Sequence, residues 1–187
     1  MTDELKGQTI AFLATEGVEQ VELTEPWKAV EQAGGKPELV SPDGGKVQGF
    51  NHLDKGDTFE ADHAAGKVAA RDFDALVLPG GVANPDALRT DEASVAFVKG
   101  FAEAGKPIAV ICHGPWTMVE ADIVRGRCMT SWPSVHTDLV NAGADWRDEE
   151  VVVCDHVPGV IVSSRKPDDL PAFCKALVEQ FSLSRTA

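Results

Sequence analysis

The segment "PIAVICHGPWTMVEA" at residues 107–121 joins two different sequence patterns at a cysteine. Before Cys112 stands the apolar run Ile-Ala-Val-Ile, which is typical of a buried strand. After it come His-Gly-Pro and a stretch that favours a helix, in which Pro115 suits the first turn. A tight turn from strand to helix exposes the side chain at the turn, and the helix N-terminus stabilises an anion there. The segment therefore predicts a reactive thiol at Cys112, with Gly114 leaving room for the turn.

The rest of the chain repeats this alternation of short apolar runs and helical patterns. Strands are predicted at residues 9–15, 37–41, 73–81 and 107–111, and helices at residues 23–34, 91–105, 116–121, 135–143 and 170–181. Strands separated by helices form parallel βαβ units, with helices on both faces of an open sheet. We therefore expect an α/β fold, a three-layer sandwich around a mostly parallel central sheet, in a single domain over residues 1–187.

Three details refine this expectation. Pro26 fits best in the first turn of the helix that follows the first strand. Residues 44–62 carry scattered Gly, Asp and Asn between short β-like pieces, which indicates a hairpin-like excursion. Residues 151–164 read as two strands that meet at Pro158-Gly159.

Composition and charge exclude several classes of partner. The chain has 43% hydrophobic and 25% charged residues, as in an ordinary globular protein, and 30 acids against 17 bases give a net charge of −13. Such an acidic chain is a poor ligand for nucleic acid or for an anionic membrane. No apolar run is long enough to span a bilayer, and the N-terminus is polar. We expect a cytoplasmic protein without nucleic-acid or membrane partners.

The four cysteines show neither CxxC pairing nor zinc-type spacing with histidine, so we expect no metal site. We expect no cofactor either, and a flavodoxin-type electron carrier is disfavoured because the loop after the first strand lacks a phosphate cradle rich in Ser, Thr and Gly. Cys128, Cys154 and Cys174 are interpreted as small buried hydrophobic residues. Cys112 differs from them by its position at a strand end.

The carboxyl ends of parallel strands share one edge of a sheet, where such folds bind ligands. This shared edge places the turn Gly80-Gly81 beside Cys112 and His113. We expect the Cys112 thiolate to attack an electrophilic carbon while His113 takes and returns protons. Backbone N–H groups near Gly81 and His113 are expected to hold the developing oxyanion.

Two features near these residues stay open from the sequence alone. Glutamates recur every three residues after the first strand, either as a solvated helix face or with one member turned inward over the thiol; they are Glu16, Glu19, Glu22 and Glu25. A Cys–His–Asp arrangement through His136 and Asp138 is the weaker alternative, because both lie in a predicted amphipathic helix.

Four segments occur in the order "VEQVELTEP", "ALVLPGG", "AVICHGPW" and "VIVSSRKP". In them the chain resembles the PfpI family of intracellular cysteine peptidases and stress proteins, within the class I glutamine amidotransferase-like superfamily. The resemblance implies a flavodoxin-like sandwich with Cys112 as nucleophile and His113 beside it. It also implies an acid after the first strand, which maps onto Glu19. A further acid from a neighbouring subunit, best matched by Asp86 at the tip of the loop after Gly81, would complete the site in a homo-oligomer.

We therefore expect a stress enzyme with a cysteine nucleophile that hydrolyses peptide or carbonyl-modified (glycated) substrates. The alternative is a redox-sensing or chaperone-like stress protein in which Cys112 is oxidised without turnover. Glutamine amidotransferase activity is disfavoured, because no His-x-Glu pair occurs late in the chain.

Overall fold

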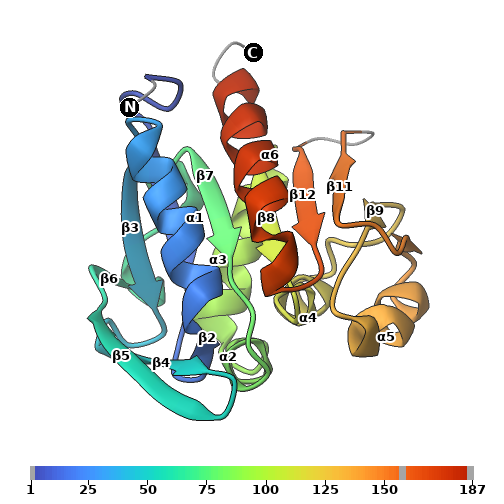
Figure 1. Cartoon of the computed structure of the whole chain (residues 1–187), viewed down its shortest axis with the longest axis horizontal. Helices are drawn as coiled ribbons and strands as arrows, with labels where there is room; N and C mark the ends of the chain where they lie inside the picture. Colours follow the sequence, from blue (N-terminus) through green and yellow to red (C-terminus); the bar gives the residue numbers. More distant parts are fainter. Residues whose placement is uncertain (1–2, 156–158, 185–187) are drawn as a thin grey trace.

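The computed structural model describes residues 3–155 and 159–184. Its centre is a seven-stranded sheet in the order β11-β12-β8-β7-β1-β3-β6 (Figure 1). The strands are β1 (Thr9–Leu13), β3 (Lys36–Ser41), β6 (His63–Ala64), β7 (Ala75–Leu78), β8 (Ile108–Ile111), β11 (Val151–Cys154) and β12 (Ile161–Ser164). The strand pairs are parallel, except that β11 runs antiparallel to β12 at the edge. The mostly parallel α/β sandwich predicted from the sequence is confirmed.

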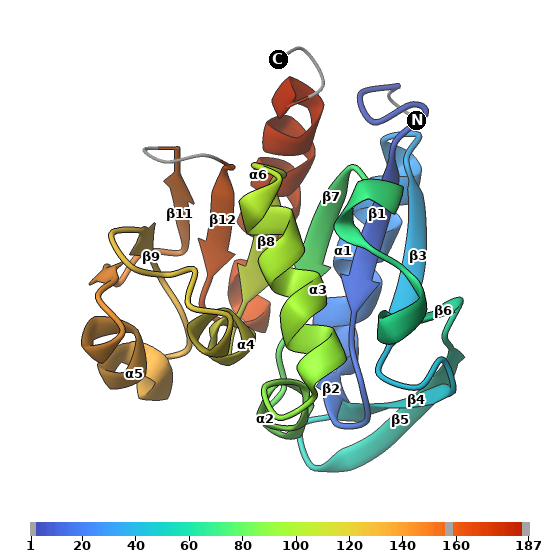
Figure 2. The same cartoon turned by 180° about the vertical axis from the view of Figure 1, so that it is seen from behind.

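Helices cover both faces of the sheet. The helix α1 (Gln20–Gln32) lies beside α6 (Leu170–Leu183) on one face, and α3 (Glu92–Glu103) lies on the other (Figures 1 and 2). Among the described residues there are also three short α-helices, α2 (Ala83–Leu88), α4 (Pro115–Glu120) and α5 (His136–Asn141). Each face has its own cluster of buried apolar side chains, one against α1 and α6 and one against α3. The alternating pattern predicted both layers because α1, α3 and α6 each present one apolar face to the sheet.

The remaining strands form two small sheets outside the central one. In the first, β2 (Val18–Glu19) pairs with β4 (Lys46–Asn51), which pairs with β5 (Asp54–Glu60). This confirms the hairpin predicted within residues 44–62, and it lies near α2 at the carboxyl ends of the parallel strands (Figure 1). In the second, β9 (Cys128–Met129) pairs with β10 (Asp145–Trp146).

The start of α1 differs from the prediction. The sequence placed Pro26 in the first turn, whereas the helix begins at Gln20 and Pro26 lies inside it. Proline lacks the N–H that would bond to the carbonyl of Glu22, so this start gives up one helical hydrogen bond. In exchange, Glu22 and Leu23 are buried, at 0% and 2% exposure. This early start turns Glu22 toward the carboxyl ends of the strands.

Two further observations concern the pairing of the last two strands and the character of the helices. The antiparallel pairing of β11 with β12 confirms the two strands predicted within residues 151–164, while Pro158 of the predicted turn lies outside the described residues. Across residues 3–155 and 159–184, no helix has the length and apolar character needed to cross a membrane.

Candidate active site

Cys112 occupies the strand-to-helix turn that the sequence predicted. It directly follows β8 and has a φ of 63°, a left-handed backbone conformation that is strained for a residue with a side chain. The backbone is fixed on both sides, because Cys112 N donates to Ser164 O at 3.1 Å and Trp132 N donates to Cys112 O at 2.9 Å. A side chain at Gly114 would place its Cβ 2.8 Å from Leu78 O, which explains the glycine there. The turn is thus built to hold one thiol in one position.

His113 lies against the thiol, with its Nδ1 3.1 Å from Cys112 Sγ. On the other side of the ring, Nε2 is 3.3 Å from Ser134 Oγ. Trp132 stacks on the imidazole at 5.7 Å between ring centres, and Trp116 packs at 5.1 Å. Burial lowers the pKa of His113, so the ring is neutral at neutral pH. A neutral ring with its proton on Nε2 donates to Ser134 and leaves Nδ1 free to accept the thiol proton.

The acid beside the thiol is Glu22, from the early turns of α1. Its Oε2 accepts a hydrogen bond from Gly80 N at 2.9 Å, and its Oε1 is buried without a hydrogen-bond partner among the described residues. Burial raises the pKa of Glu22 to about 8, and the interaction with Cys112 is the largest effect opposing that rise. The carboxyl is therefore neutral at pH 7 and holds a proton next to the sulfur.

Glu19, the acid that the family resemblance indicated, has a different place. It lines the same pocket, but its carboxylate accepts from the backbone N–H of His52, with Oε2 at 3.1 Å. Glu19 thus ties β2 to the turn of the β4–β5 hairpin. The structure brings Glu22 rather than Glu19 to the thiol, because α1 begins at Gln20 and its first turns face the sheet edge. The three-residue spacing of the glutamates was the signal for Glu22, but it did not single it out.

Ionisation of Cys112 is coupled to Glu22. Burial raises the pKa of the Cys112 thiol, and the charge of an ionised Glu22 raises it further. Hydrogen bonds from the backbone N–H groups of Gly81 and His113 act in the opposite direction. The expected stabilisation of the thiolate by the turn is present, but it is outweighed by burial in the isolated chain. Below pH 8 a neutral Glu22 adds no opposing charge.

Gly80 and Gly81 lie directly against Cys112 and Glu22. A Cβ at Gly80 would lie 2.5 Å from Glu22 Oε2 and 2.6 Å from Cys112 Cβ, so only glycine lets these two side chains meet. Gly81 has a φ of +82° and aims its N–H at the sulfur. The expected use of the Gly81 and His113 N–H groups as an oxyanion hole stays a prediction.

A pocket of about 390 Å³ opens above Cys112. Beyond the residues already described, its wall is largely apolar, with Phe50 and Leu53 from the hairpin, Val82 after the glycine turn, and Trp132. Leu53 is 94% exposed, Val82 58% and Trp132 38%. Sequence reasoning missed these residues and Ser134, because they come from segments without a recognisable chemical pattern.

Asp86 lies outside this pocket within one chain. The sequence placed it at a loop tip, whereas it is an exposed residue in the first turn of the short helix α2. The loop winds into a helix because the buried Asn84 fixes its start, donating to Pro79 O and Gly80 O and accepting from Thr15 N. The role of Asp86 toward a second chain stays a prediction.

The alternative through His136 and Asp138 is wrong. Asp138 Oδ2 accepts from Trp116 Nε1 at 2.7 Å, and the His136 ring packs on Trp146 at 4.6 Å between centres. Neither residue lines the pocket of Cys112. The described residues also contain no group of three or more His, Cys, Asp or Glu side chains suited to a metal ion.

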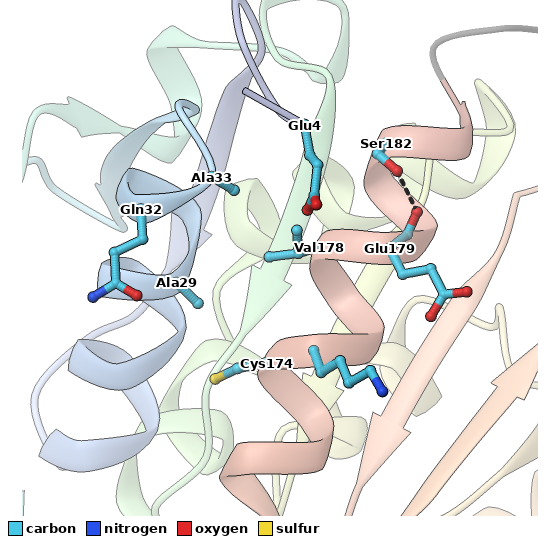
Figure 3. Close-up of a pocket in the computed structure, with 9 residues that line it drawn as sticks. Glu4, Ala29, Gln32, Ala33, Cys174, Val178, Glu179 and Ser182 are labelled. Atoms are coloured by element: carbon cyan, nitrogen blue, oxygen red, sulfur yellow. Dashed lines mark hydrogen bonds between the residues drawn. The ribbon is translucent and has the colours of Figure 1, made fainter. Parts of the chain in front are cut away.

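A wider groove of about 690 Å³ lies between α1 and α6 and shares no lining residue with the pocket of Cys112. Cys174 lies on its wall, with Ala29 and Ala33 on the facing helix (Figure 3). Burial raises the pKa of Cys174 to about 12, so it stays a thiol at neutral pH. The described residues that line the groove include no histidine, whereas His113 Nδ1 lies 3.1 Å from Cys112 Sγ in the other pocket.

Comparisons with known proteins find similar sequences and folds over most of the chain. The model of the DJ-1/PfpI family matches residues 8–180. The chain is 43% identical over 164 residues to the Bacillus subtilis protein named "Putative cysteine protease YraA", covering 88% of this chain and 92% of that protein. It is 38% identical over 170 residues to Deglycase PH1704 of Pyrococcus horikoshii, covering 91% and 97%. Among solved structures, the ThiJ/PfpI domain protein from Brachyspira murdochii superposes with a TM-score of 0.85 at 26% identity, covering 95% and 98%.

Proposed function

Because this chain belongs to the DJ-1/PfpI family, we propose that it is a stress enzyme that uses Cys112 as a nucleophile on carbonyl carbons. One observation carries the proposal: the thiol of Cys112 on its strained backbone turn, a neutral histidine and a protonated carboxyl meet in one pocket. His113 Nδ1 lies 3.1 Å from Cys112 Sγ, and Glu22 shares the same wall. Three such groups in contact form a nucleophile with its base and an acid.

The geometry supports a simple sequence of proton transfers. As the sulfur attacks a carbonyl carbon, the thiol proton passes to His113 Nδ1 and the C=O bond opens to an oxyanion. The N–H groups of Gly81 and His113, which point at the sulfur, lie close enough to stabilise that charge. The imidazolium then returns its proton to the oxyanion of an aldehyde adduct, or to the leaving amine of a peptide or a hemiaminal. At a peptide the amine leaves a thioester, which water hydrolyses. At the hemiaminal carbon of a glycated group the sulfur displaces the amine and leaves a hemithioacetal, which expels the thiol and releases the carbonyl compound.

The relatives' names support two substrate classes, glycated groups and peptides. The pocket favours the first. Its volume of about 390 Å³ fits one carbonyl-modified side chain or a small carbonyl compound, and its wall is mostly apolar. The four cysteines are all free, which suits a reducing compartment, and we place the protein in the cytoplasm.

We expect turnover of methylglyoxal or of a methylglyoxal-modified peptide, with a covalent adduct on Cys112 after mass labelling. The alternative, a redox-sensing or chaperone-like protein, uses the same thiol without turnover. If the amount of product exceeds the amount of protein when peroxide is excluded, the enzymatic function is supported. Stoichiometric oxidation of Cys112 with no product from carbonyl or peptide substrates would favour the alternative.

We also propose that the site is shared between copies of the chain in a homo-oligomer. The exposed apolar side chains of Val82 and Trp132 flank the pocket, and contact with a second copy would bury them. The family resemblance assigns the completing acid to Asp86 of the neighbour. A carboxylate near His113 and Ser134 would stabilise the imidazolium formed during attack.

Mixing two inactive variants tests this arrangement. Neither Cys112→Ala nor Asp86→Ala alone has a complete site, but a hybrid interface pairs the intact cysteine of one chain with the intact aspartate of the other. We expect partial recovery of activity, up to about a quarter of wild type for random mixing in equal amounts, because each hybrid interface contains one complete and one empty site. Native mass spectrometry would establish that subunits have exchanged. Exchange without recovery would contradict a shared site.

A further inference from the structure

A second pair of cysteines lies apart from the active site. Cys128 in β9 and Cys154 at the end of β11 pack in the apolar cluster on the α3 face of the sheet, whereas Cys112 packs in the cluster on the α1 and α6 face. The backbone N–H of Cys128 donates to Cys154 Sγ at 3.2 Å, and the two thiols are hydrogen-bonded to each other. Two cysteines in such contact lie within reach of a disulfide without a large backbone movement.

The surroundings give the two thiols different properties. Arg127 hydrogen-bonds the sulfur of Cys154, and its Nη1 also donates to Gly159 O at 2.7 Å. Burial, together with the charge of an ionised Cys154, raises the pKa of Cys128 to about 11. Arg147 also attracts the charge of an ionised Cys128. Arg127, however, is hydrogen-bonded to the sulfur of Cys154, and a cation in direct contact makes that sulfur the first to react.

Both thiols are buried, but the strand that carries Cys154 lies at the edge of the sheet. Within the described residues, β11 pairs in the central sheet with β12 alone, over four residues, and its Val153 is 38% exposed. Short edge strands open locally far more often than a whole domain unfolds. Such openings admit an oxidant as small as hydrogen peroxide.

We propose that Cys128 and Cys154 form a second modification site, at which a hydroperoxide converts the pair to an intramolecular disulfide. The Cys154 thiolate attacks one peroxide oxygen, the O–O bond breaks, and a sulfenic acid and one water or alcohol result. The sulfur of Cys128 then attacks the sulfenic sulfur. The S–S bond forms, the S–O bond breaks, and the hydroxide leaves as water with the Cys128 proton. Two thiols lose two electrons and two protons in total, and the peroxide is reduced by the same two electrons.

The disulfide would close the segment between residues 128 and 154, which holds two contacts of His113. Trp132 stacks on that ring and Ser134 hydrogen-bonds its Nε2. Oxidation at this pair would therefore restrain the part of the chain that positions His113, without changing Cys112 itself. The proposal does not depend on the activity proposed above.

The test uses a Cys112→Ser, Cys174→Ser variant, which keeps only the two thiols of the pair. After treatment with hydrogen peroxide and denaturation, we expect the free thiols to fall from two to none and to return with dithiothreitol. Peptide mapping should find Cys128 joined to Cys154 within one chain. The matched control carries Cys154→Ser as well, so Cys128 has no second thiol in its own chain. Peroxide should produce no intrachain disulfide in this control.

Three results would overturn the proposal. They are retention of both thiols at peroxide doses that oxidise Cys112 in the wild type, separate sulfinic acids on Cys128 and Cys154, and a disulfide between two chains. If the double variant does not fold, the same mapping is performed on wild-type protein whose Cys112 has first been blocked with iodoacetamide. That measurement has the same supporting and contradicting outcomes.

Discussion

Cys112→Ser should abolish turnover and leave the fold intact. Serine is nearly isosteric with cysteine, and its hydroxyl can keep the contact with His113 Nδ1, so we expect the free energy of unfolding to change by no more than about 1 kcal/mol. A serine hydroxyl is a far weaker nucleophile when the surrounding groups are arranged for a thiol. Loss of a nucleophile typically lowers kcat by about a thousandfold or more. Initial rates on the modified peptide and chemical denaturation measure the two quantities on the same preparation.

Cys174→Ser is the matched control, because Cys174 is a partly buried thiol in the groove between α1 and α6. Its activity should equal that of the wild type. Alkylation at near-neutral pH followed by peptide mapping should also label Cys112 before the other three cysteines. Preferential labelling of Cys128, Cys154 or Cys174, or residual turnover in Cys112→Ser, would defeat the assignment of the nucleophile.

Glu22→Gln should change how stability depends on pH. Burial raises the pKa of Glu22 from 4.5 to about 8, so between these values the folded protein holds a proton that the unfolded chain releases. The contribution of this group to stability is therefore greatest below pH 4.5 and falls as pH rises toward 8. Glutamine does not ionise and can still accept from Gly80 N. We expect the stability of Glu22→Gln relative to wild type to grow by on the order of 3 kcal/mol between pH 5 and pH 8.

Glu22→Gln should also change how the alkylation rate of Cys112 depends on pH. Above pH 8 an ionised Glu22 raises the pKa of Cys112, so its removal should make alkylation of Cys112 faster there than in the wild type. Glu19→Gln is the matched control, since Glu19 lines the pocket but binds His52 N. Because the charge of Glu19 contributes only a small part of the raised pKa of Glu22, Glu19→Gln should shift both pH profiles far less than Glu22→Gln does. A shift in the Cys112 profile of Glu19→Gln, with none in Glu22→Gln, would return the acid's role to Glu19.

The sequence by itself determined the layers of this protein and the strand-to-helix turn that carries Cys112. Alternating apolar runs and helical patterns are local signals, and each of them indicates which face of its own strand or helix is buried. The turn at Cys112 was equally local: an apolar strand, a cysteine, glycine and proline within a few residues. The prediction that Gly81 and Cys112 lie at the same edge of the sheet followed from the rule that parallel strands end at one edge. It did not depend on any particular side-chain contact.

Only the tertiary structure decided which glutamate meets the thiol. Glu19 and Glu22 are one helical turn apart, and their spacing fits both positions. The choice depended on where α1 begins, and burial of Glu22 and Leu23 moved that start ahead of Pro26. A helix start fixed by long-range burial, at the loss of one hydrogen bond, leaves no signature in the local pattern.

The partners of His113 and the second cysteine pair were hidden for the same reason. Ser134 lies 21 residues beyond His113, and Cys154 lies 26 residues beyond Cys128. Nothing in the spacing of such residues encodes their contact. The contacts arise because β9 packs against β11 and β12, while the turn at Trp132 packs beside the end of β8, where Trp132 N donates to Cys112 O. Short-range patterns determine which segments form and which faces they bury, whereas the packing of those faces together determines which side chains meet.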